Sequence, residues 1–546
     1  MLPLKRILEG MRIRTFIEFN TTAKIKVFLS LCGLLGISQI QAQQSQLDTI
    51  NIDPTEKELR LSHPEITFSK PLDFTDTQVM FEHQKLNFSR VQTPSKTTIL
   101  GFGSQGIFQF KPNLILSGKL KVESENESEV PYILTDERTT NQNFISNPAY
   151  FYVPRKSDWL RQNYYINGNL AYNPWKGLLI GAEVEGSFLK AYSSRDPRPE
   201  IGNYEYHLDA KVGYKLKNHS LFVKAGYFNR QKRSKISYSN TNLNAPNHFD
   251  TYIRFNRGYG NYYYNDTFGD VEYQYDGVSF GAEYLYETQK NVLLVGYKNE
   301  FYIDRLTRFY TYQIRDENNV LRTFRDIQKI AGLRTDKHQI YARYLGNIGN
   351  WKWSSQMDFI DQEDLNYDYQ GLYTSYKALN QNLSWQNYFS RWNSKNELLR
   401  LGGHLTVGNQ NVKDLSVVMN KKLQFLDYQI SGEKEFRLKQ NQKIALEVRH
   451  GLYLPLNSKM IYEPYQSSQE NIFVKNIVIP DYFYDSSTRL NLGIQLKYFI
   501  DLKRVRYEVY ARGQQWYFVN NRNGQEKGNI NTDANQYVSL GFNFYY

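Results

Sequence analysis

The sequence has 546 residues, a formal net charge of +12, a mean hydropathy of −0.63 and a single cysteine, Cys32. The basic excess is too diffuse for a nucleic-acid-binding protein, and the cysteine count disfavours a disulfide-stabilised exported domain. Aromatic residues make up 15% of the chain and include 45 tyrosines. This composition fits a transmembrane β-sheet in which alternate residues face lipid and amphipathic aromatic rings gather at the two membrane–water interfaces.

The first 42 residues have the order of an export signal. Basic residues from Lys5 to Lys26 precede an apolar run over residues 27–40, which is too short for a comfortable membrane-spanning helix. Ile40-Gln41-Ala42 then offers a small residue at a plausible cleavage point. We therefore expect residues 1–42 to be a cleaved signal peptide.

Residues 43–98 are polar, contain several prolines and show little sustained periodicity. Residues 59–61 and 66–68 are candidates for short strands. We expect this segment to lie in the periplasm or to enter the lumen of the domain that follows it.

From residue 99 to residue 546 the chain alternates between apolar and polar residues. Clear examples are residues 178–188, 204–216 and 490–498. These runs exceed the usual five or six residues of a globular strand and match the length that crosses a bilayer at a tilt. The pattern predicts an all-β fold, a transmembrane antiparallel β-barrel over residues 99–546.

The connections between these runs alternate between short and long. Tight turns are expected at residues 173–176, 217–219 and 348–350, whereas residues 233–266 and 455–486 are long and irregular. Short periplasmic turns and long extracellular loops are typical of outer-membrane barrels. We count about 18 strands, with a range of 16–20, and an even number if both ends of the barrel domain lie in the periplasm.

The C-terminal strand has one apolar face. Val538, Leu540, Phe542, Phe544 and Tyr546 share that face, and small or polar residues occupy the other. This ending resembles the C-terminal signal of bacterial outer-membrane barrels. It predicts a location in the bacterial cell outer membrane, with lipid and lipopolysaccharide as neighbours, and recognition by the barrel-assembly machinery through the strand that ends in Phe544 and Tyr546.

Residues 162–232 resemble a known family. The most specific part is Arg195-Asp196-Pro197-Arg198-Pro199, which follows an early strand. The stretch is similar to an outer-membrane β-barrel family of Bacteroidota that is catalogued as a domain of unknown function, and the resemblance spans roughly residues 99–546. Members are often encoded near TonB-dependent uptake receptors, so the resemblance implies such a receptor as a possible partner and no established activity.

Arg195, Asp196 and Arg198 form the first candidate site. In the favoured interpretation they belong to a rigid loop in which two prolines fix φ and Asp196 pairs with a neighbouring arginine. In the alternative, the loop folds into the lumen and the arginines bind a carboxylate or phosphate.

Tyr259, Tyr262, Tyr263 and Tyr264 form the second candidate site, in a stretch rich in Tyr, Gly and Asn. They are either a stacking surface for a sugar or cofactor on an external loop or part of the outer aromatic girdle. The girdle and its turn residues are the favoured interpretation.

The acidic run at Asp358, Asp361, Glu363, Asp364 and Asp368 lacks the glycine and spacing of a calcium loop, so a solvated loop is the favoured interpretation. The eight histidines are scattered and have no zinc-motif spacing. We expect no catalytic residues, no metal and no cofactor, and we do not expect an enzyme.

Charged residues on the inward faces of the expected strands predict a wet lumen. They are Lys211, Lys215, Lys224, Arg504, Arg506 and Arg512. The sequence therefore favours a solute uptake or transport pore, or an accessory to an uptake system. Two alternatives stay open: a non-conducting binding or assembly component of the outer membrane, and an outer-membrane enzyme with an active site at the rim.

Overall fold

The computed structural model describes residues 52–137, 147–238, 253–259, 262–264, 270–315, 320–369, 372–394, 396–463, 473–502, 505–521 and 534–546. The expected signal peptide lies outside these residues.

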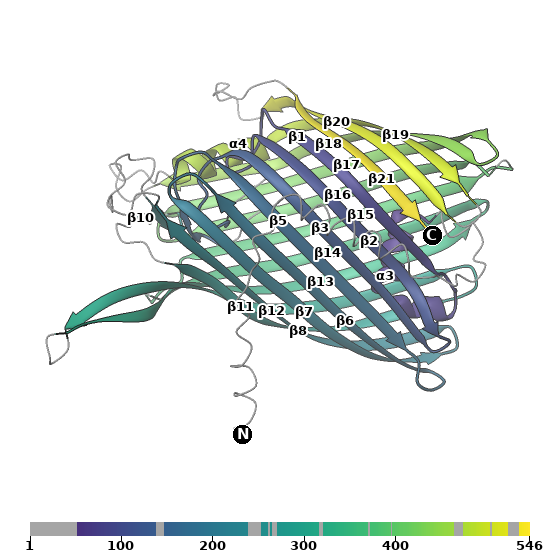
Figure 1. The fold of residues 1–546 in the computed structure, drawn as a ribbon, viewed down its shortest axis with the longest axis horizontal. Coiled ribbons are helices and arrows are strands. Elements are labelled where there is room, and N and C mark those ends of the chain that lie inside the picture. Colours follow the sequence, from purple (N-terminus) through teal and green to yellow (C-terminus); the bar gives the residue numbers. More distant parts are fainter. Residues whose placement is uncertain are drawn as a thin grey trace. The chain divides into compact units, whose positions relative to one another are not determined.

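Within them, eighteen antiparallel strands form one closed barrel (Figure 1). β1 (Phe74–Lys85) pairs with β2 (Lys96–Lys111) and also with the last strand, β21 (Asn535–Tyr545), so the sheet closes on itself. Closure satisfies the backbone of both terminal strands, as a bilayer requires. The other strands of the barrel are β3 (Leu114–Val130), β5 (Ser157–Tyr172), β6 (Leu178–Ser193), β7 (Arg198–Leu216), β8 (His219–Ser237), β11 (Val271–Glu287), β12 (Val292–Arg315), β13 (Leu321–Ile348), β14 (Trp351–Asp368), β15 (Tyr376–Trp392), β16 (Leu398–Asp414), β17 (Val418–Lys439), β18 (Gln442–Glu463), β19 (Ser487–Asp501) and β20 (Arg506–Asn521).

The predicted barrel and the predicted number of strands are confirmed, but the barrel begins before residue 99. β1 lies inside the segment that was expected to precede the barrel. Its register runs from Asp76 against Tyr545 to Lys85 against Gln536, so without β1 the cylinder would stay open. The barrel therefore starts at β1 because the sheet must close, and closure cannot be recognised from the local sequence pattern.

The two ends of the barrel differ. At one end, which we call the short-turn end, the connections contain two to five residues, and both the start of β1 and the C-terminus lie there. At the other end, the long-loop end, the connections include residues 238–270 and 464–486. This asymmetry is the one that the sequence predicts.

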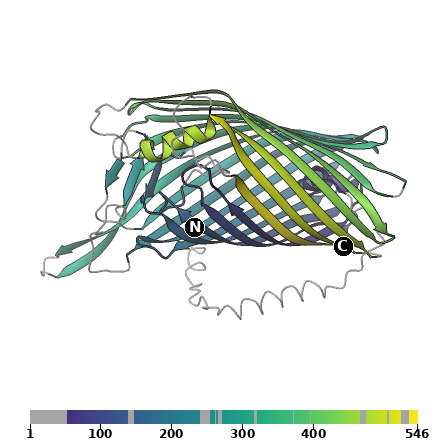
Figure 2. The same ribbon diagram turned by 90° about the horizontal axis from the view of Figure 1, so that it is seen from above.

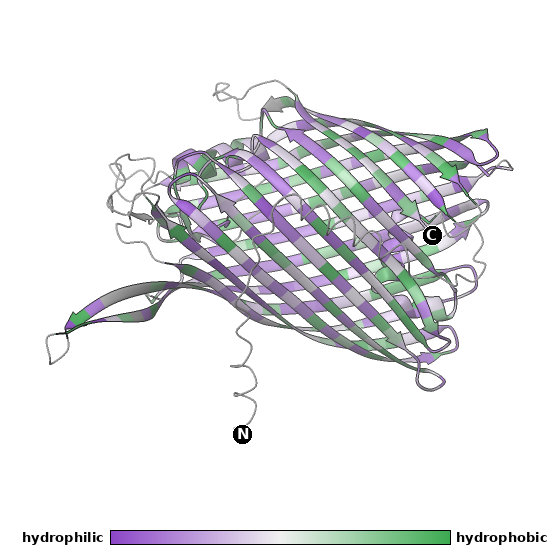
Figure 3. Cartoon of the chain, in the orientation of Figure 1, coloured by the Kyte–Doolittle hydropathy of each residue, from purple (hydrophilic) through white to green (hydrophobic). Residues whose placement is uncertain are grey.

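Hydrophobic and hydrophilic residues alternate along the strands of the barrel (Figure 3). Leu208, Leu492 and Phe542 are 44%, 44% and 40% exposed, and each lies on the outer face of its strand. Their neighbours on the inner faces, such as Lys211 and Ser539, are buried. A soluble barrel has a polar exterior and an apolar interior. The opposite distribution found in this protein suits a barrel that is surrounded by lipid.

Two helical segments lie at opposite ends of the barrel (Figure 2). α3 (Pro54–Ser62) and η2 (Pro64–Phe68) occupy the lumen at the short-turn end. η4 (Val474–Val478) and α4 (Ile479–Asp485) belong to the connection between β18 and β19 at the long-loop end. Within the described residues, every helix is too short or too polar to cross a bilayer.

The short strands expected at residues 59–61 and 66–68 are helical instead. The Asp53 carboxylate caps the first turn by accepting from the Glu56 amide at 3.0 Å, and Pro54 is the first helical residue. This capping signal outweighs the alternation of so short an apolar patch.

A second, small sheet lines the long-loop end. Its strands are β4 (Ala149–Tyr152), β9 (Arg254–Arg257) and β10 (Tyr262–Tyr264), in the order β10-β9-β4. Phe151 of β4 stacks on Phe255 of β9, and both belong to one apolar cluster with Tyr273, an inward residue of β11. At the long-loop end, β4 and β9 therefore pack against the inner face of the barrel.

Candidate functional site

The segment from α3 to η2, residues 53–68, is held inside the barrel by polar contacts with the wall and by the apolar side chains of Leu59, Leu61 and Ile66, which pack against wall residues. We call it the plug. Ser354 of β14 donates to the Asp53 carboxylate at 2.8 Å, and Lys352 of the same strand forms an ion pair with Glu56. Ser117 of β3 donates to a plug carbonyl at 2.6 Å. The plug is thus attached to strands on different sides of the cylinder.

The strongest attachment lies at η2. The Glu65 carboxylate is 2.6 Å from the Lys211 ammonium of β7 and 3.3 Å from His63 Nδ1. Glu283 of β11 lies 3.8 Å from His63 and 3.0 Å from Lys224. Burial alone would raise the pKa of Glu65, but Lys211 and His63 outweigh it and hold that pKa at about 2.

His63, Glu65 and Glu283 bring three potential metal ligands together. The Lys211 ammonium already lies among them, 2.6 Å from Glu65, 3.3 Å from His63 Nδ1 and 3.9 Å from Glu283. A lysine in that place supplies the positive charge that a cation would bring. The cluster therefore joins the plug to the wall.

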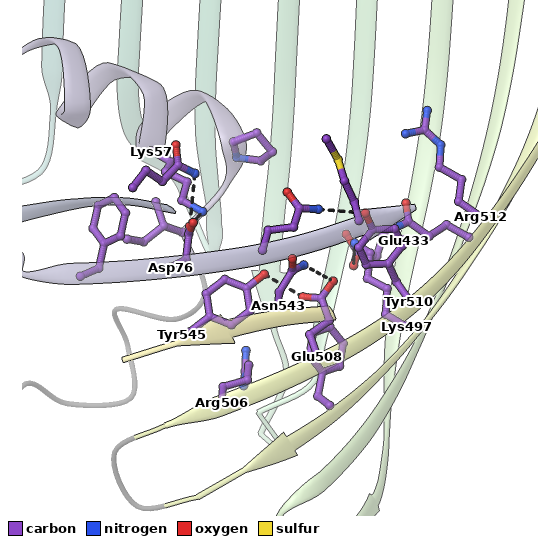
Figure 4. A pocket seen from close by; sticks show the side chains of 18 of the residues that line it. Lys57, Asp76, Glu433, Lys497, Arg506, Glu508, Tyr510, Arg512, Asn543 and Tyr545 are labelled. Atoms are coloured by element: carbon purple, nitrogen blue, oxygen red, sulfur yellow. Dashed lines mark hydrogen bonds and ion pairs between the residues drawn. The ribbon is translucent and has the colours of Figure 1, made fainter. Parts of the chain in front are cut away.

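A cavity of about 570 Å³, cavity A, lies between the plug and the wall formed by β1 and β16–β21 (Figure 4). Its lining mixes both charges. Glu433 accepts from Lys497 at 2.7 Å and from Arg400 at 3.0 Å, while Glu508 accepts from Tyr545 at 2.8 Å. Most charges of cavity A are already paired, which describes a wet, nearly neutral chamber.

Arg512 of β20 differs from these paired residues. Its guanidinium lies 5.3 Å from the Tyr537 ring, and its Nε is buried with no hydrogen-bond partner in the described part of the chain. Arg512 lines both cavity A and a second cavity of about 500 Å³, cavity B, whose lining comes from β1–β3, β5, β20 and β21. It therefore lies at the junction of two chambers.

A third cavity of about 420 Å³, cavity C, lies nearer the long-loop end against β16–β19. Cavities B and C share Gln84, Leu86 and Trp516 in their linings, as cavities A and B share Glu82 and Arg512. The three cavities thus adjoin one another along β1 and β20, from the plug towards the long-loop end.

Charged contacts attach α4 to the wall and to the β1–β2 connection beside cavity C. The Asp485 carboxylate of α4 pairs with Arg90 at 2.8 Å and with Lys421 of β17 at 3.1 Å. Burial would raise the pKa of Asp485, but the two cations hold it below its usual value. The Val91 amide donates to Asp481 at 2.7 Å, so the β1–β2 connection is attached to α4 as well. We call α4 and the strands β4, β9 and β10 the cap.

The first predicted site lies at the β6–β7 connection. Arg198 pairs with Asp196 at 3.0 Å, and Arg195 donates to the Lys156 carbonyl at 3.3 Å. Both arginines are exposed, and they line none of cavities A, B and C. These contacts agree with the rigid-loop interpretation, in which Asp196 pairs with an arginine.

The second predicted site is divided by the structure. Tyr259 packs 5.8 Å from the Tyr376 ring and 6.1 Å from the Phe473 ring, inside the cap. Tyr262, Tyr263 and Tyr264 form β10 and pair with β9 through their backbones, and their side chains lie outside the described part of the chain. Tyr259 therefore belongs neither to an external stacking surface nor to an outer girdle.

The acidic run is a strand and not a solvated loop. All five residues lie in β14, so consecutive positions alternate between its two faces. Asp358 pairs with Arg343 at 2.8 Å, Thr335 donates to Asp364 at 2.6 Å, and Glu363 pairs with Lys377 at 2.6 Å. Asp358, Asp364 and Asp368 share one face, but they are four or more residues apart along the strand, about 13 Å or more, so they do not converge on one cation.

The charged inward faces are confirmed where they are described. Lys211, Lys215 and Lys224 all reach carboxylates inside the barrel, and Arg506 lines cavity A. Arg504 lies outside the described residues. The plug residues Asp53, Glu56 and Glu65 were not singled out, although an aspartate before a proline is a helix-capping signal.

The apolar exterior, the closed sheet and the charged lumen together define a transmembrane β-barrel protein. The chain belongs to the family of unknown function DUF6850, which matches residues 65–546. That match covers all eighteen strands and η2 except its first residue, Pro64, and it begins after α3.

No curated protein matches the chain. Among solved structures, the ferric preacinetobactin receptor BauA from Acinetobacter baumannii is 10% identical with a TM-score of 0.42, over 87% of this chain and 80% of that one. The ferric yersiniabactin uptake receptor FyuA from Yersinia pestis is 8% identical with a TM-score of 0.41, over 87% and 79%. Similarity at this level concerns the fold alone.

Proposed function

We propose that this protein takes up a solute through the outer membrane of a bacterium of the Bacteroidota, and that the plug closes its lumen until it moves. The observation that carries the proposal is the set of adjoining polar cavities between cap and plug. A barrel with a merely structural role has no need of such chambers, and cavities of 300–1,000 Å³ are of ligand size.

The way in which the plug is held supports a movable closure. Its described contacts with the wall include ion pairs, such as Glu56 with Lys352 and Glu65 with Lys211, besides the apolar packing of Leu59, Leu61 and Ile66. The ion pairs can be exchanged for water when the lumen hydrates, whereas the apolar packing resists movement and favours the closed position. The proposal assigns the chain no catalytic role.

The surroundings follow from the same proposal. The apolar outer face contacts lipid and lipopolysaccharide, and β21 is the strand that the barrel-assembly machinery recognises. The short-turn end faces the periplasm, where a TonB-dependent receptor or another partner reaches the plug. The long loops face the exterior.

Planar-bilayer conductance tests the proposal. The full chain is expected to show little steady current, and a variant that lacks residues 52–69 and carries Asp485→Asn, which removes the anion that holds the cap, is expected to show a steady open channel. The double variant Glu65→Gln with Lys352→Met, which keeps the whole chain, is expected to open intermittently. Heat-modifiable migration on gels verifies that each barrel is folded.

A second candidate function follows from the cap. Because Asp485, Arg90 and Lys421 attach the cap above cavity C, the lumen is obstructed at the long-loop end too. If folded barrels that lack the plug and also carry Asp485→Asn stay silent, uptake is contradicted. A non-conducting binding component of the outer membrane is then the better assignment.

A further inference from the structure

One row of inward residues crosses three strands beside cavity C. Asp427 of β17 lies directly opposite Tyr453 of β18, and Tyr453 lies directly opposite Arg489 of β19. All three residues line the cavity. Since neighbouring strands are about 4.8 Å apart, the backbones of Asp427 and Arg489 are separated by about 9.6 Å.

Tyr453 keeps the two charges apart. The Arg489 guanidinium lies 3.8 Å from the centre of the Tyr453 ring and 4.0 Å from that of Tyr484, so it is held between two aromatic faces. Its Nη1 is buried and has no hydrogen-bond partner among the described residues. The structure thus presents a positioned cation whose donor faces no acceptor.

Asp427 is the complementary group. The described residues include none that hydrogen-bonds to its carboxylate or forms an ion pair with it within 4 Å, and Arg489 and His404, which both line the cavity, act on it only through their fields. The other charged residue of the lining, Arg90, is already neutralised by Asp485. Cavity C therefore holds one unmatched cation and one unmatched anion on the same wall.

Two neutral side chains of the lining, Gln410 and Asn491, also have buried acceptors without a partner among the described residues. Gln410 is 7% exposed, and its Oε1 is buried without a hydrogen-bond partner within the described ranges. Asn491 Oδ1 is also buried and has no hydrogen-bond partner among the described residues. Both are acceptors, so a ligand that satisfies the lining brings donors as well as an acceptor for Arg489. An anion without O–H or N–H groups, such as chloride or sulfate, fails that requirement.

We propose that cavity C binds a small zwitterion, an amino acid or a short peptide, whose carboxylate pairs with Arg489 and whose ammonium group pairs with Asp427. The extended backbone of a dipeptide spans about 7 Å, which suits two side chains that reach inward from backbones about 9.6 Å apart. Phe425, Tyr484 and Trp516 line the remaining wall and favour an apolar side chain on the ligand.

This inference rests on the proposed uptake function for its biological meaning, but its test measures binding without transport. The full chain in detergent micelles is titrated with L-alanyl-L-phenylalanine in a calorimeter. Acetylation of the peptide amine and amidation of its carboxylate are each expected to weaken binding about tenfold or more, because each removes one buried charge pair. These two arms need no protein variant.

Variants assign each end of the ligand. Arg489→Gln is expected to bind the free and the amidated peptide equally, and Asp427→Asn is expected to bind the free and the acetylated peptide equally. Asp209→Asn, which removes a carboxylate from the inner face of β7 away from cavity C, is expected to keep both preferences. Heat-modifiable migration reports whether each variant is folded.

The inference is overturned if the parent chain gives no binding heat, if blocked and free peptides bind alike, or if maltose binds in their place. Maltose binding would assign the aromatic rings and amides to a saccharide. Peptide binding to a barrel that never conducts would contradict only the uptake function, whereas conduction without peptide binding would contradict only the zwitterion site.

Discussion

The Glu65 carboxylate of the plug lies 2.6 Å from the Lys211 ammonium of β7, and both side chains are buried. The two residues are far apart in the sequence and meet only because η2 enters the barrel. A buried ion pair adds little net stability by itself, but removal of one partner leaves an uncompensated charge. The pair therefore makes the closed position of the plug sensitive to single changes.

Substitution of Lys211 by methionine should release the plug. The change leaves Glu65 buried beside Glu283, and we expect the closed position to lose about 3–5 kcal/mol. Limited proteolysis of the plug in liposome-embedded protein measures the effect. Lys190→Met removes an exposed ion pair between Lys190 of β6 and Glu200 of β7. It should change the free energy of plug opening, derived from the proteolysis rate, by less than about 1 kcal/mol. Equal protection of parent and Lys211→Met would contradict the role of the pair.

Acid should loosen the plug. The pKa of Glu65 is about 2 in the folded protein and 4.5 without its partners, so its contribution is complete above pH 4.5 and is lost as the pH falls towards 2. We expect more opening events at pH 3 than at pH 7 in bilayer recordings. Glu65→Gln cannot titrate, and it should lose most of this response. An unchanged response in that variant would assign the acid sensitivity to other groups.

A disulfide between plug and wall should block uptake. Asp53 and Ser354 approach through side-chain atoms 2.8 Å apart, and the only native cysteine is Cys32, in the expected signal peptide. Cells with Asp53→Cys and Ser354→Cys together should take up L-alanyl-L-phenylalanine only after a reductant is added. Ser354→Cys alone should behave like the parent. Uptake that is indifferent to the reductant would show that solutes pass without movement of the plug.

A charged residue introduced on the outer face should destabilise the barrel more, the closer it lies to the middle of the bilayer. Leu208 lies in the middle of β7, and Leu216 ends the same strand on the same face at the short-turn end. We expect Leu208→Arg to reduce the free energy of unfolding by about 2–4 kcal/mol and Leu216→Arg by about 0–1 kcal/mol. Urea unfolding from liposomes, followed by tryptophan fluorescence, measures both. Equal effects at the two positions would argue against a bilayer around this strand.

The barrel itself is predictable from residues that are near one another in the sequence. The alternation around Leu208 gives the strand, its outer face and its length, because side chains on a strand point to opposite faces with a period of two. The C-terminal strand through Phe542 is predicted in the same way. The helical plug is not, because Asp53 and Pro54 are weak signals beside an apolar patch that also suits a strand.

The boundary at residue 99 shows where local reasoning ends. Residues 74–85 alternate only partly, and they become β1 because β21 needs a partner to close the cylinder. Similarly, Tyr259 reads as an external aromatic residue, but the cap folds inward and buries it against Tyr376. Both outcomes depend on partners more than a hundred residues away.

By itself the sequence determined that this chain forms a barrel with an apolar outside and a charged inside, since that property repeats at every second residue. Only the tertiary structure decided which charges meet. Glu65 finds Lys211, whereas Asp427 and Arg489 are held apart by Tyr453, and these relations depend on the register between strands. Register is set when the whole sheet closes, so no single strand carries it.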